Sequence, residues 1–155
     1  MRADRSIDSI QWIDLPRPPA QDLASLERLY FDWVPRIGAH LAAAEPLAAG
    51  TGRPLTIEAQ LPARLPAIRM TAPEQAPGRR ARAIFGGLLA HPGGELALEL
   101  TRRPGAPEGS VRLTVALRRF RPRLPLFVYL LTQRRLHERS TFAFLREVAR
   151  IVSPE

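Results

Sequence analysis

Residues 95–100 (ELALEL) and 111–118 (VRLTVALR) decide the fold, because apolar side chains take every second position in both. Such alternation predicts half-buried β-strands. The side of the first stretch that faces away from its leucines carries Glu95 and Glu99, whereas the corresponding side of the second carries Arg112 and Arg118. Opposite charges stabilise strands that face each other across a ladder. The two segments are therefore predicted to be antiparallel neighbours.

Four further segments extend the predicted sheet to about six strands. They are residues 7–13, 55–61, 65–71 and 81–90. Residues 55–61 alternate apolar and polar side chains, as a half-buried strand does, and 65–71 is a second, weaker candidate. The pair Gly86-Gly87 predicts a bulge or a close backbone approach within the 81–90 strand. The stretch 71–80, which is rich in proline, predicts a loop.

Helical spacing marks both ends of the chain. Asp22 opens an N-terminal helix whose apolar stripe includes Tyr30 and Trp33, and Pro35 predicts a kink or two helices over about 20–34 and 36–45. A C-terminal helix is predicted from Pro125 to about Val152, with a polar middle over 132–141. Either this helix is continuous, or two helices meet near Ser140, which could cap the second.

Length and composition are typical of one globular domain over residues 1–155. The absence of cysteine excludes disulfides, thiolate catalysis and cysteine zinc sites. All 23 basic residues are arginine, and the lack of lysine excludes Schiff-base chemistry. The start has no apolar core of signal-peptide length, and the longest apolar run is far shorter than the roughly 20 residues of a bilayer span. A soluble, cytoplasmic protein is the expectation.

The positive charge is concentrated in the second half of the chain. Residues 1–75 hold 8 arginines and 9 acids, whereas residues 76–155 hold 15 arginines and 6 acids. The densest cluster is Arg118, Arg119, Arg121 and Arg123. Arginine binds phosphate well, so residues 118–135 could dock on an anionic membrane or, less favoured because aromatic residues are few, on RNA. The alternative is an ordinary buried helix start flanked by solvated arginines.

Common catalytic and phosphate-binding motifs are absent from the sequence. His137-Glu138 begins like a zinc-binding helix motif, but position 141 is threonine, so the second ligand is missing. The spacing of His40, His91 and His137 does not predict a metal site, and no cofactor or catalytic residue is assigned. On one helix face, Arg134, His137 and Thr141 could hold an anionic or carbonyl-bearing ligand, although simple solvent exposure is the alternative.

The order of the predicted elements resembles the START-like superfamily of polyketide cyclases and lipid-transport proteins, also called the helix-grip fold. That order is a strand, a broken helix, several antiparallel strands and a long C-terminal helix, and it spans Ile7 to Val152. The resemblance implies an α+β fold in which a curved antiparallel sheet and the last helix enclose an apolar cavity. It also implies binding of a hydrophobic small molecule. No motif allows a catalytic residue of the family to be carried over.

Our first hypothesis from the sequence is therefore a binding module for a hydrophobic or amphipathic small molecule. The residues that we would test are Trp33, Phe85, Tyr129, Arg134 and His137. The second hypothesis is the basic peripheral protein that docks through residues 118–135. An enzyme that uses His137 with a nearby carboxylate ranks third, and an interaction or chaperone-like module has no positive signal. The ligand and the oligomeric state stay open.

Overall fold

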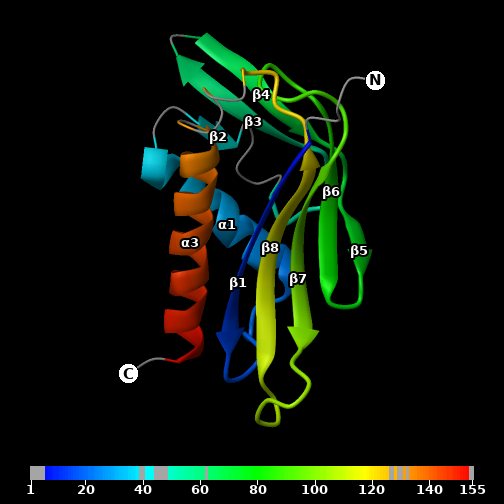
Figure 1. Cartoon of the computed structure of the whole chain (residues 1–155), viewed down its shortest axis with the longest axis vertical. Coiled ribbons are helices and arrows are strands. Elements are labelled where there is room, and N and C mark those ends of the chain that lie inside the picture. The colour runs from blue at the N-terminus through cyan, green and yellow to red at the C-terminus, as the bar shows by residue number, and fades with distance from the viewer. Residues whose placement is uncertain are drawn as a thin grey trace.

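A bent antiparallel sheet with two helices packed against it forms the described part of the protein (Figure 1). The computed structural model describes residues 6–38, 41–43, 49–61, 63–125, 128, 131 and 133–153. The helices are α1 (Leu23–Gly38) and α3 (Gln133–Val152). The strands are β1 (Ile7–Leu15), β2 (Leu41–Ala43), β3 (Leu55–Leu61), β4 (Ala63–Met70), β5 (Glu74–Ala76), β6 (Arg79–Gly86), β7 (Glu95–Arg102) and β8 (Val111–Phe120).

The sheet runs in the order β1-β8-β7-β6-β4-β3-β2, and β5 pairs with β6 beside this path. Every pairing is antiparallel. In Figure 1, β3 and β4 run obliquely across one end of the sheet, whereas β1, β8 and β7 run along its length. The predicted α+β class, with a curved antiparallel sheet and a long C-terminal helix, is confirmed.

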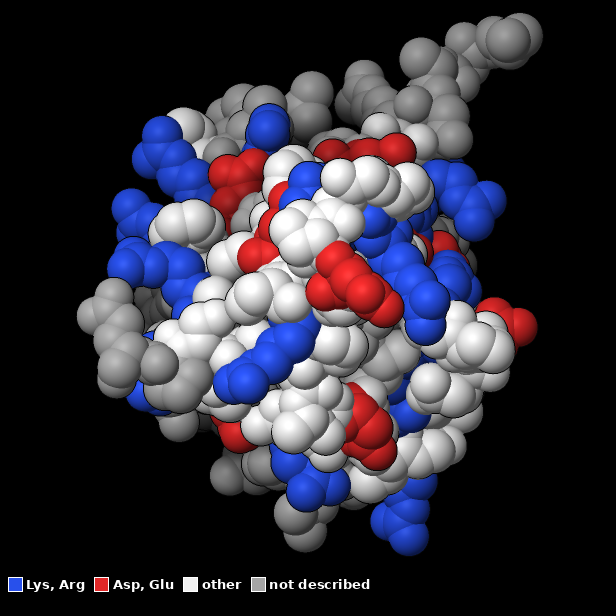
Figure 2. Space-filling model, turned by 90° about the horizontal axis from the view of Figure 1, so that it is seen from below, with Lys and Arg blue, Asp and Glu red and all other residues white. Residues whose placement is uncertain are grey.

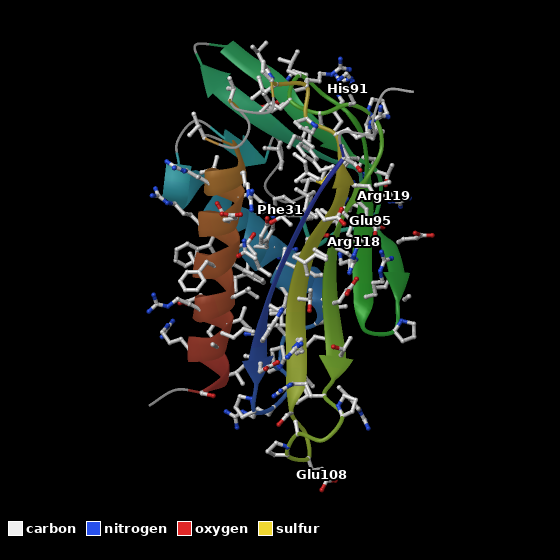
Figure 3. All side chains as sticks on the ribbon, in the orientation of Figure 1. Phe31, His91, Glu95, Glu108, Arg118 and Arg119 are labelled. Carbon is white, nitrogen blue, oxygen red and sulfur yellow. The ribbon has the colours of Figure 1, made fainter. Side chains whose placement is uncertain are left out.

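The two strands that decided the prediction lie side by side as β7 and β8. Glu95 is opposite Arg118, and Leu98 is opposite Val115. Val115 and its apolar neighbours on β8 point into the core. On the other face, Arg118 donates to Glu99 at 2.7 Å, and Figure 3 shows Glu95 and Arg118 close together. The complementary charges thus fall where the alternation placed them.

Two short strands raise the number from the predicted six to eight among the described residues. The predicted loop 71–80 contains β5, which is fully exposed and pairs only with the start of β6. The intervening turn includes Gly78 at φ +70°, where a Cβ would lie 2.6 Å from the carbonyl oxygen of Leu100. The loop prediction was therefore wrong, because a local hairpin supplies backbone pairing that exposed polar side chains do not reveal.

The N-terminal helix differs from the prediction at its end. The side chain of Asp22 caps α1 by accepting from the amide of Ser25 at 2.8 Å. α1 then continues through Pro35 to Gly38, so of the two predicted alternatives, a kink or two helices, the second was wrong. Residues 41–43 were predicted as helix but form β2, where Leu41 lies opposite Ala59 of β3. Pairing with a distant strand overrides local helical spacing here.

The glycine pair marks a close approach of two backbones, as predicted. A Cβ at Gly87 would lie 2.2 Å from the carbonyl oxygen of Ala67, and the φ of Gly87 is +128°. The next two amides, of Leu88 and Leu89, donate to the carbonyls of Pro66 and Ala67. Only glycine fits where the chain leaving β6 continues along β4.

The C-terminal helix α3 passes through Ser140 without interruption, so the alternative of two helices meeting there was wrong. It lies against β1 and α1, and Figure 1 shows it running alongside the sheet. The guanidinium of Arg17 donates twice to the last helical carbonyl, of Val152, at 2.7 and 3.0 Å. No helix among the described residues is long and apolar enough to cross a bilayer.

Candidate ligand-binding site

The inner face of α3 changes character along its length. Its C-terminal half contributes only apolar side chains to the core; they are Phe144, Leu145, Val148 and Val152. Its N-terminal half carries the polar residues His137, Ser140 and Thr141 on the same side, and the last two are fully buried. Polar groups at core positions need partners, so the N-terminal half is the part of this layer where chemistry is concentrated.

Tyr30 of α1 reaches the polar half of α3 from the neighbouring helix. Its hydroxyl lies 3.3 Å from Nδ1 of His137 and 3.4 Å from Oγ1 of Thr141. His137 and Thr141 are four residues apart, so one helical turn presents both to the same phenol. Both distances are long for hydrogen bonds that involve a hydroxyl. The three side chains therefore form a loosely bonded buried cluster.

Burial keeps this cluster uncharged. It lowers the pKa of His137 from 6.5 to about 4, and the nearby Glu138 carboxylate offsets this only in part. Burial also raises the pKa of the Tyr30 phenol to about 12, against a smaller lowering by the hydrogen bond with Thr141. At neutral pH the imidazole and the phenol are both neutral. The cluster can exchange hydrogen bonds with a neutral group without any change of charge.

Two atoms of this region are buried without a hydrogen-bond partner in the described part of the chain. They are Nε2 of His137 and the hydroxyl oxygen of Ser140. Among the same residues, no carboxylate hydrogen-bonds to His137; Glu138 instead accepts from Arg134 at 2.8 Å. The hypothesis of an acid–base pair between His137 and a carboxylate therefore finds no contact to support it.

Aromatic rings border the cluster on the core side. The ring of Tyr30 meets those of Phe31 and Phe144 edge to face, with centroids 5.1 and 5.4 Å away. Figure 3 places Phe31 in the layer between α3 and the sheet. Trp33, one turn beyond Tyr30 on α1, is half-buried and packs against the same core. The polar cluster thus lies next to apolar and aromatic surface.

A second buried polar cluster lies one turn earlier on α1 and was not foreseen from the sequence. Glu27 is buried and forms ion pairs with Arg80 and Arg82 of β6 at 3.1 and 2.8 Å. Burial raises the pKa of Glu27, but the hydrogen bonds from Arg82, Gly50 and Arg80 outweigh this effect and leave the pKa lowered. The carboxylate is therefore ionised at neutral pH.

Arg82 is almost completely surrounded by acceptors. Its guanidinium donates to both carboxylate oxygens of Glu27 and to the carbonyls of Thr51, Arg53 and Thr71. These bonds join α1, β6 and the segment before β3. The sequence signal was available: Glu27 stands within the apolar stripe of α1, between Leu26 and Tyr30, where a charge requires a buried partner.

Solved structures match the arrangement of this fold over nearly the whole chain. TTHA0849 from Thermus thermophilus is 11% identical, with a TM-score of 0.50 over 94% of this chain and 97% of its own. The fold is α+β and helix-grip-like. The sheet order and the placement of α1 and α3 thus bear out the resemblance predicted from element order. At this identity the likeness concerns the fold alone.

Two further structures are similar at slightly lower scores. A START superfamily protein from Mycobacterium smegmatis is 13% identical, with a TM-score of 0.49 over 94% of this chain and 96% of its own. Ara h 8.0201 is 14% identical, with a TM-score of 0.48 over 92% of this chain and 97% of its own. No protein-family model and no curated protein matches the sequence.

The structure does not gather the five predicted ligand residues in one place. His137 lies in the buried cluster and Trp33 one turn from it, on α1. Phe85 is 47% exposed on β6 and alternates with the inward-facing Ile84, so it lies on the outer face of the sheet. Arg134 is exposed and pairs with Glu138. Tyr129 lies outside the described residues.

The predicted arginine cluster is divided among different surroundings. Arg118 pairs with Glu99 on the outer sheet face, and Arg123 donates to the carbonyls of Gly87 and Ala90. Arg119 and Arg121 are exposed, and Figure 3 shows Arg119 beside Arg118. Arg118 and Arg123 therefore bond to other parts of the sheet and its connections. Docking through residues 118–135 stays a prediction, because part of that range lies outside the described residues.

Charge is also mixed at the end of the molecule seen in Figure 2, where arginines alternate with acidic and uncharged residues. His91 is at the end opposite Glu108 in Figure 3, and His40 lies outside the described residues. No group of three or more metal-binding side chains occurs among the residues that the structure describes.

Proposed function

We propose that the protein binds a hydrophobic or amphipathic small molecule in the interior between α3, α1 and the sheet. The observation that carries this proposal is Nε2 of His137, which is buried without a partner in the described part of the chain, while Nδ1 of the same ring meets Tyr30. Leaving such an atom unsatisfied costs about 1–3 kcal/mol, and most buried polar atoms in proteins do have a partner. A bound molecule would supply it.

The surroundings of His137 favour a ligand that is mainly apolar. Sites for small molecules combine apolar and aromatic walls with a few polar groups that fix orientation. Here the rings of Tyr30, Phe31 and Phe144 provide aromatic surface next to the polar atoms of His137, Thr141 and Ser140. The START-like fold supports the same conclusion, because proteins that resemble it are expected to enclose an apolar cavity between the sheet and the last helix.

The charge state of the cluster favours an uncharged polar group on the ligand. A neutral imidazole and a neutral phenol can bond to a hydroxyl or carbonyl, whereas a buried carboxylate or phosphate would need a cation beside it. Arg134 shares a helix face with His137, but its side chain is exposed and pairs with Glu138. We therefore assign the site to molecules with a hydroxyl, carbonyl or ether group on an apolar body.

Displacement of an environment-sensitive lipophilic dye tests the proposal, together with native mass spectrometry of the purified full chain. The wild-type protein should bind the dye in the interior and release it to long-chain alcohols, and it should carry copurified small molecules. Replacing His137→Leu removes the polar atoms but keeps an apolar side chain, so alcohols should displace the dye at least tenfold less effectively. Arg134→Gln, on the same helix but exposed, is the matched control and should behave like wild type.

Two outcomes would contradict the proposal. The first is wild-type protein that binds no dye and carries no small molecule. The second is equal displacement by alcohols in the wild type and in His137→Leu, since the polar atom would then be irrelevant. An ordered water is the competing partner for Nε2 of His137. Water alone would leave the protein without any competable ligand.

A further inference from the structure

The solvent face of α3 carries a continuous stripe of exposed residues that the ligand site does not use. Its members are spaced three or four positions apart, so they lie on one side of the helix. They are Arg135, Arg139, Phe142, Arg146 and Arg150, and the exposed Leu131 lies four positions before Arg135 in the sequence, ahead of the first residue of α3. The inward-facing residues His137, Thr141, Phe144 and Val148 lie on the opposite side. We call the exposed set the arginine stripe.

The arginine stripe contains no acidic residue. Glu138 pairs with Arg134 at 2.8 Å, and Glu147 pairs with Arg150 at 2.7 Å. By helical geometry both glutamates lie at the margins of the stripe, not within it. Within the described part of the chain, Arg135 and Arg139 have no acidic partner. The stripe therefore presents several positive charges that α3 does not neutralise.

The arginine stripe also exposes apolar surface. Phe142 is 59% exposed and Leu131 is 58% exposed, although both are large and hydrophobic. The guanidinium of Arg146 lies 5.6 Å from the centre of the Phe142 ring, within the range of a cation–π contact. The exposed ring of Phe142 therefore offers apolar surface to a partner, and the guanidinium of Arg146 places a positive charge beside it. Together these side chains form an amphipathic strip on the outside of the molecule.

We propose that the arginine stripe docks α3, parallel to the surface, on an anionic lipid bilayer. Interfacial helices combine basic residues that meet lipid headgroups with aromatic and aliphatic residues that enter the acyl boundary. Arginines can extend toward the headgroups while their methylene groups stay with the apolar side chains. Each basic residue near such a surface strengthens binding about fivefold. The inference does not depend on the ligand site, since no residue of the stripe belongs to it.

The composition of the stripe favours a bilayer over a nucleic acid. Proteins that bind single strands use several aromatic rings on which bases stack. The stripe has one ring, Phe142, and its other exposed apolar residue is the aliphatic Leu131. A leucine gains from contact with acyl chains but offers nothing to a base stack. The charge of the stripe complements headgroup phosphates spread over a surface.

Cosedimentation of the full chain with vesicles tests the inference. The protein should bind vesicles of phosphatidylcholine and phosphatidylserine but not of phosphatidylcholine alone, and the binding should weaken as salt is added. Replacing Arg135, Arg139, Arg146 and Arg150 by glutamine should weaken it about a hundredfold or more. Phe142→Ala, which leaves the charge unchanged, should weaken it several-fold.

A matched variant controls for net charge. Replacing Arg28, Arg53, Arg69 and Arg102 by glutamine removes the same charge from exposed positions outside the stripe and outside residues 118–135. It should lose far less binding than the stripe variant. Equal losses in both variants, or no vesicle binding by the wild type, would overturn the inference. So would binding of single-stranded RNA by the wild type that the stripe variant loses, without any binding to vesicles. Circular dichroism checks that each variant is folded.

Discussion

Two buried polar clusters lie one helical turn apart on α1, and they differ in charge and in the number and strength of the bonds that each makes. The Glu27 cluster joins a carboxylate to Arg80 and Arg82 through charge-assisted hydrogen bonds of 2.8 to 3.3 Å, and backbone carbonyls accept from the same guanidinium groups. Nε of Arg80 meets the carboxylate only as an ion pair at 3.1 Å, without a hydrogen bond among the described residues. The Tyr30 cluster joins neutral groups through contacts of 3.3 and 3.4 Å and leaves Nε2 of His137 without a partner among the described residues.

This difference separates a structural cluster from a candidate site. A buried ion pair with many charge-assisted bonds fixes the position of the segments that it joins, and here these are α1, β6 and the segment before β3. An incompletely bonded cluster retains the capacity to bind something else. Glu27 and Tyr30 are three residues apart on α1. The cluster around Glu27 stabilises the fold, whereas we propose that the cluster around Tyr30 binds a ligand.

The largest effect is expected where the ion-paired Glu27 cluster is broken. Glu27→Gln leaves the charges of Arg80 and Arg82 buried without an anion, because both depend on that carboxylate. Removing one partner of a buried ion pair lowers the free energy of unfolding by about 3–5 kcal/mol. Urea unfolding followed by circular dichroism should show a loss of this size in the free energy of unfolding.

Glu108→Gln is the control for this substitution. Glu108 is exposed in the loop after β7, at the far end of the molecule in Figure 3. An exposed substitution of this kind changes stability by about 0.5 kcal/mol or less. If Glu27→Gln were as mild as Glu108→Gln, the Glu27 cluster would not hold the fold together, and the contrast between the clusters would disappear.

An intermediate effect is expected from the titration of His137. Its folded pKa of about 4 is below the value of 6.5 that the unfolded chain would have. As the pH falls through this window, the unfolded state binds a proton that the folded state rejects. Stability is thus fully present above about pH 6.5 and is lost between there and about pH 4. Between about pH 7 and pH 5 the loss amounts to about 2 kcal/mol.

His137→Leu should remove this part of the pH dependence. Urea unfolding at the two pH values measures it as a smaller loss of stability than in the wild type. His91→Gln, in an exposed turn, should keep the wild-type dependence. A wild-type slope in His137→Leu would show that the imidazole is protonated as readily in the folded protein as in the unfolded chain, and so is not buried as a neutral group.

Local patterns explain which parts of the fold were predictable. The alternation of β7 and β8 is visible in the sequence because each strand buries one face and exposes the other. β2 was predicted as helix, since Leu41 continues the spacing of the apolar stripe and nothing local announces its pairing with Ala59. β5 has three exposed residues and no buried face, so no periodicity could indicate it.

The candidate site was predictable only in part for a related reason. His137 stood out as one of three histidines, but Tyr30 was assigned to ordinary core packing. The two residues are 107 positions apart in sequence, and only the packing of α1 on α3 brings them together. Glu27 was recoverable in principle, because it interrupts an apolar stripe. Its partners on β6 were not, since Arg80 was assigned to a loop.

The smallest effect is expected from a substitution of Ser140, which lies beside His137 in the cluster that is incompletely hydrogen-bonded. The hydroxyl oxygen of Ser140 is buried in α3 without a partner in the described part of the chain, so Ser140→Ala removes a group that contributes nothing to folding. Alanine is also the better helix former. The variant should be more stable than the wild type by about 0.5 kcal/mol in urea unfolding.

Thr141→Ala is the matched control. The hydroxyl of Thr141 contacts Tyr30, so this variant should be less stable than the wild type. If Ser140→Ala were the destabilised one, its hydroxyl would have a partner in solution, and the region around His137 would be more completely bonded than we propose.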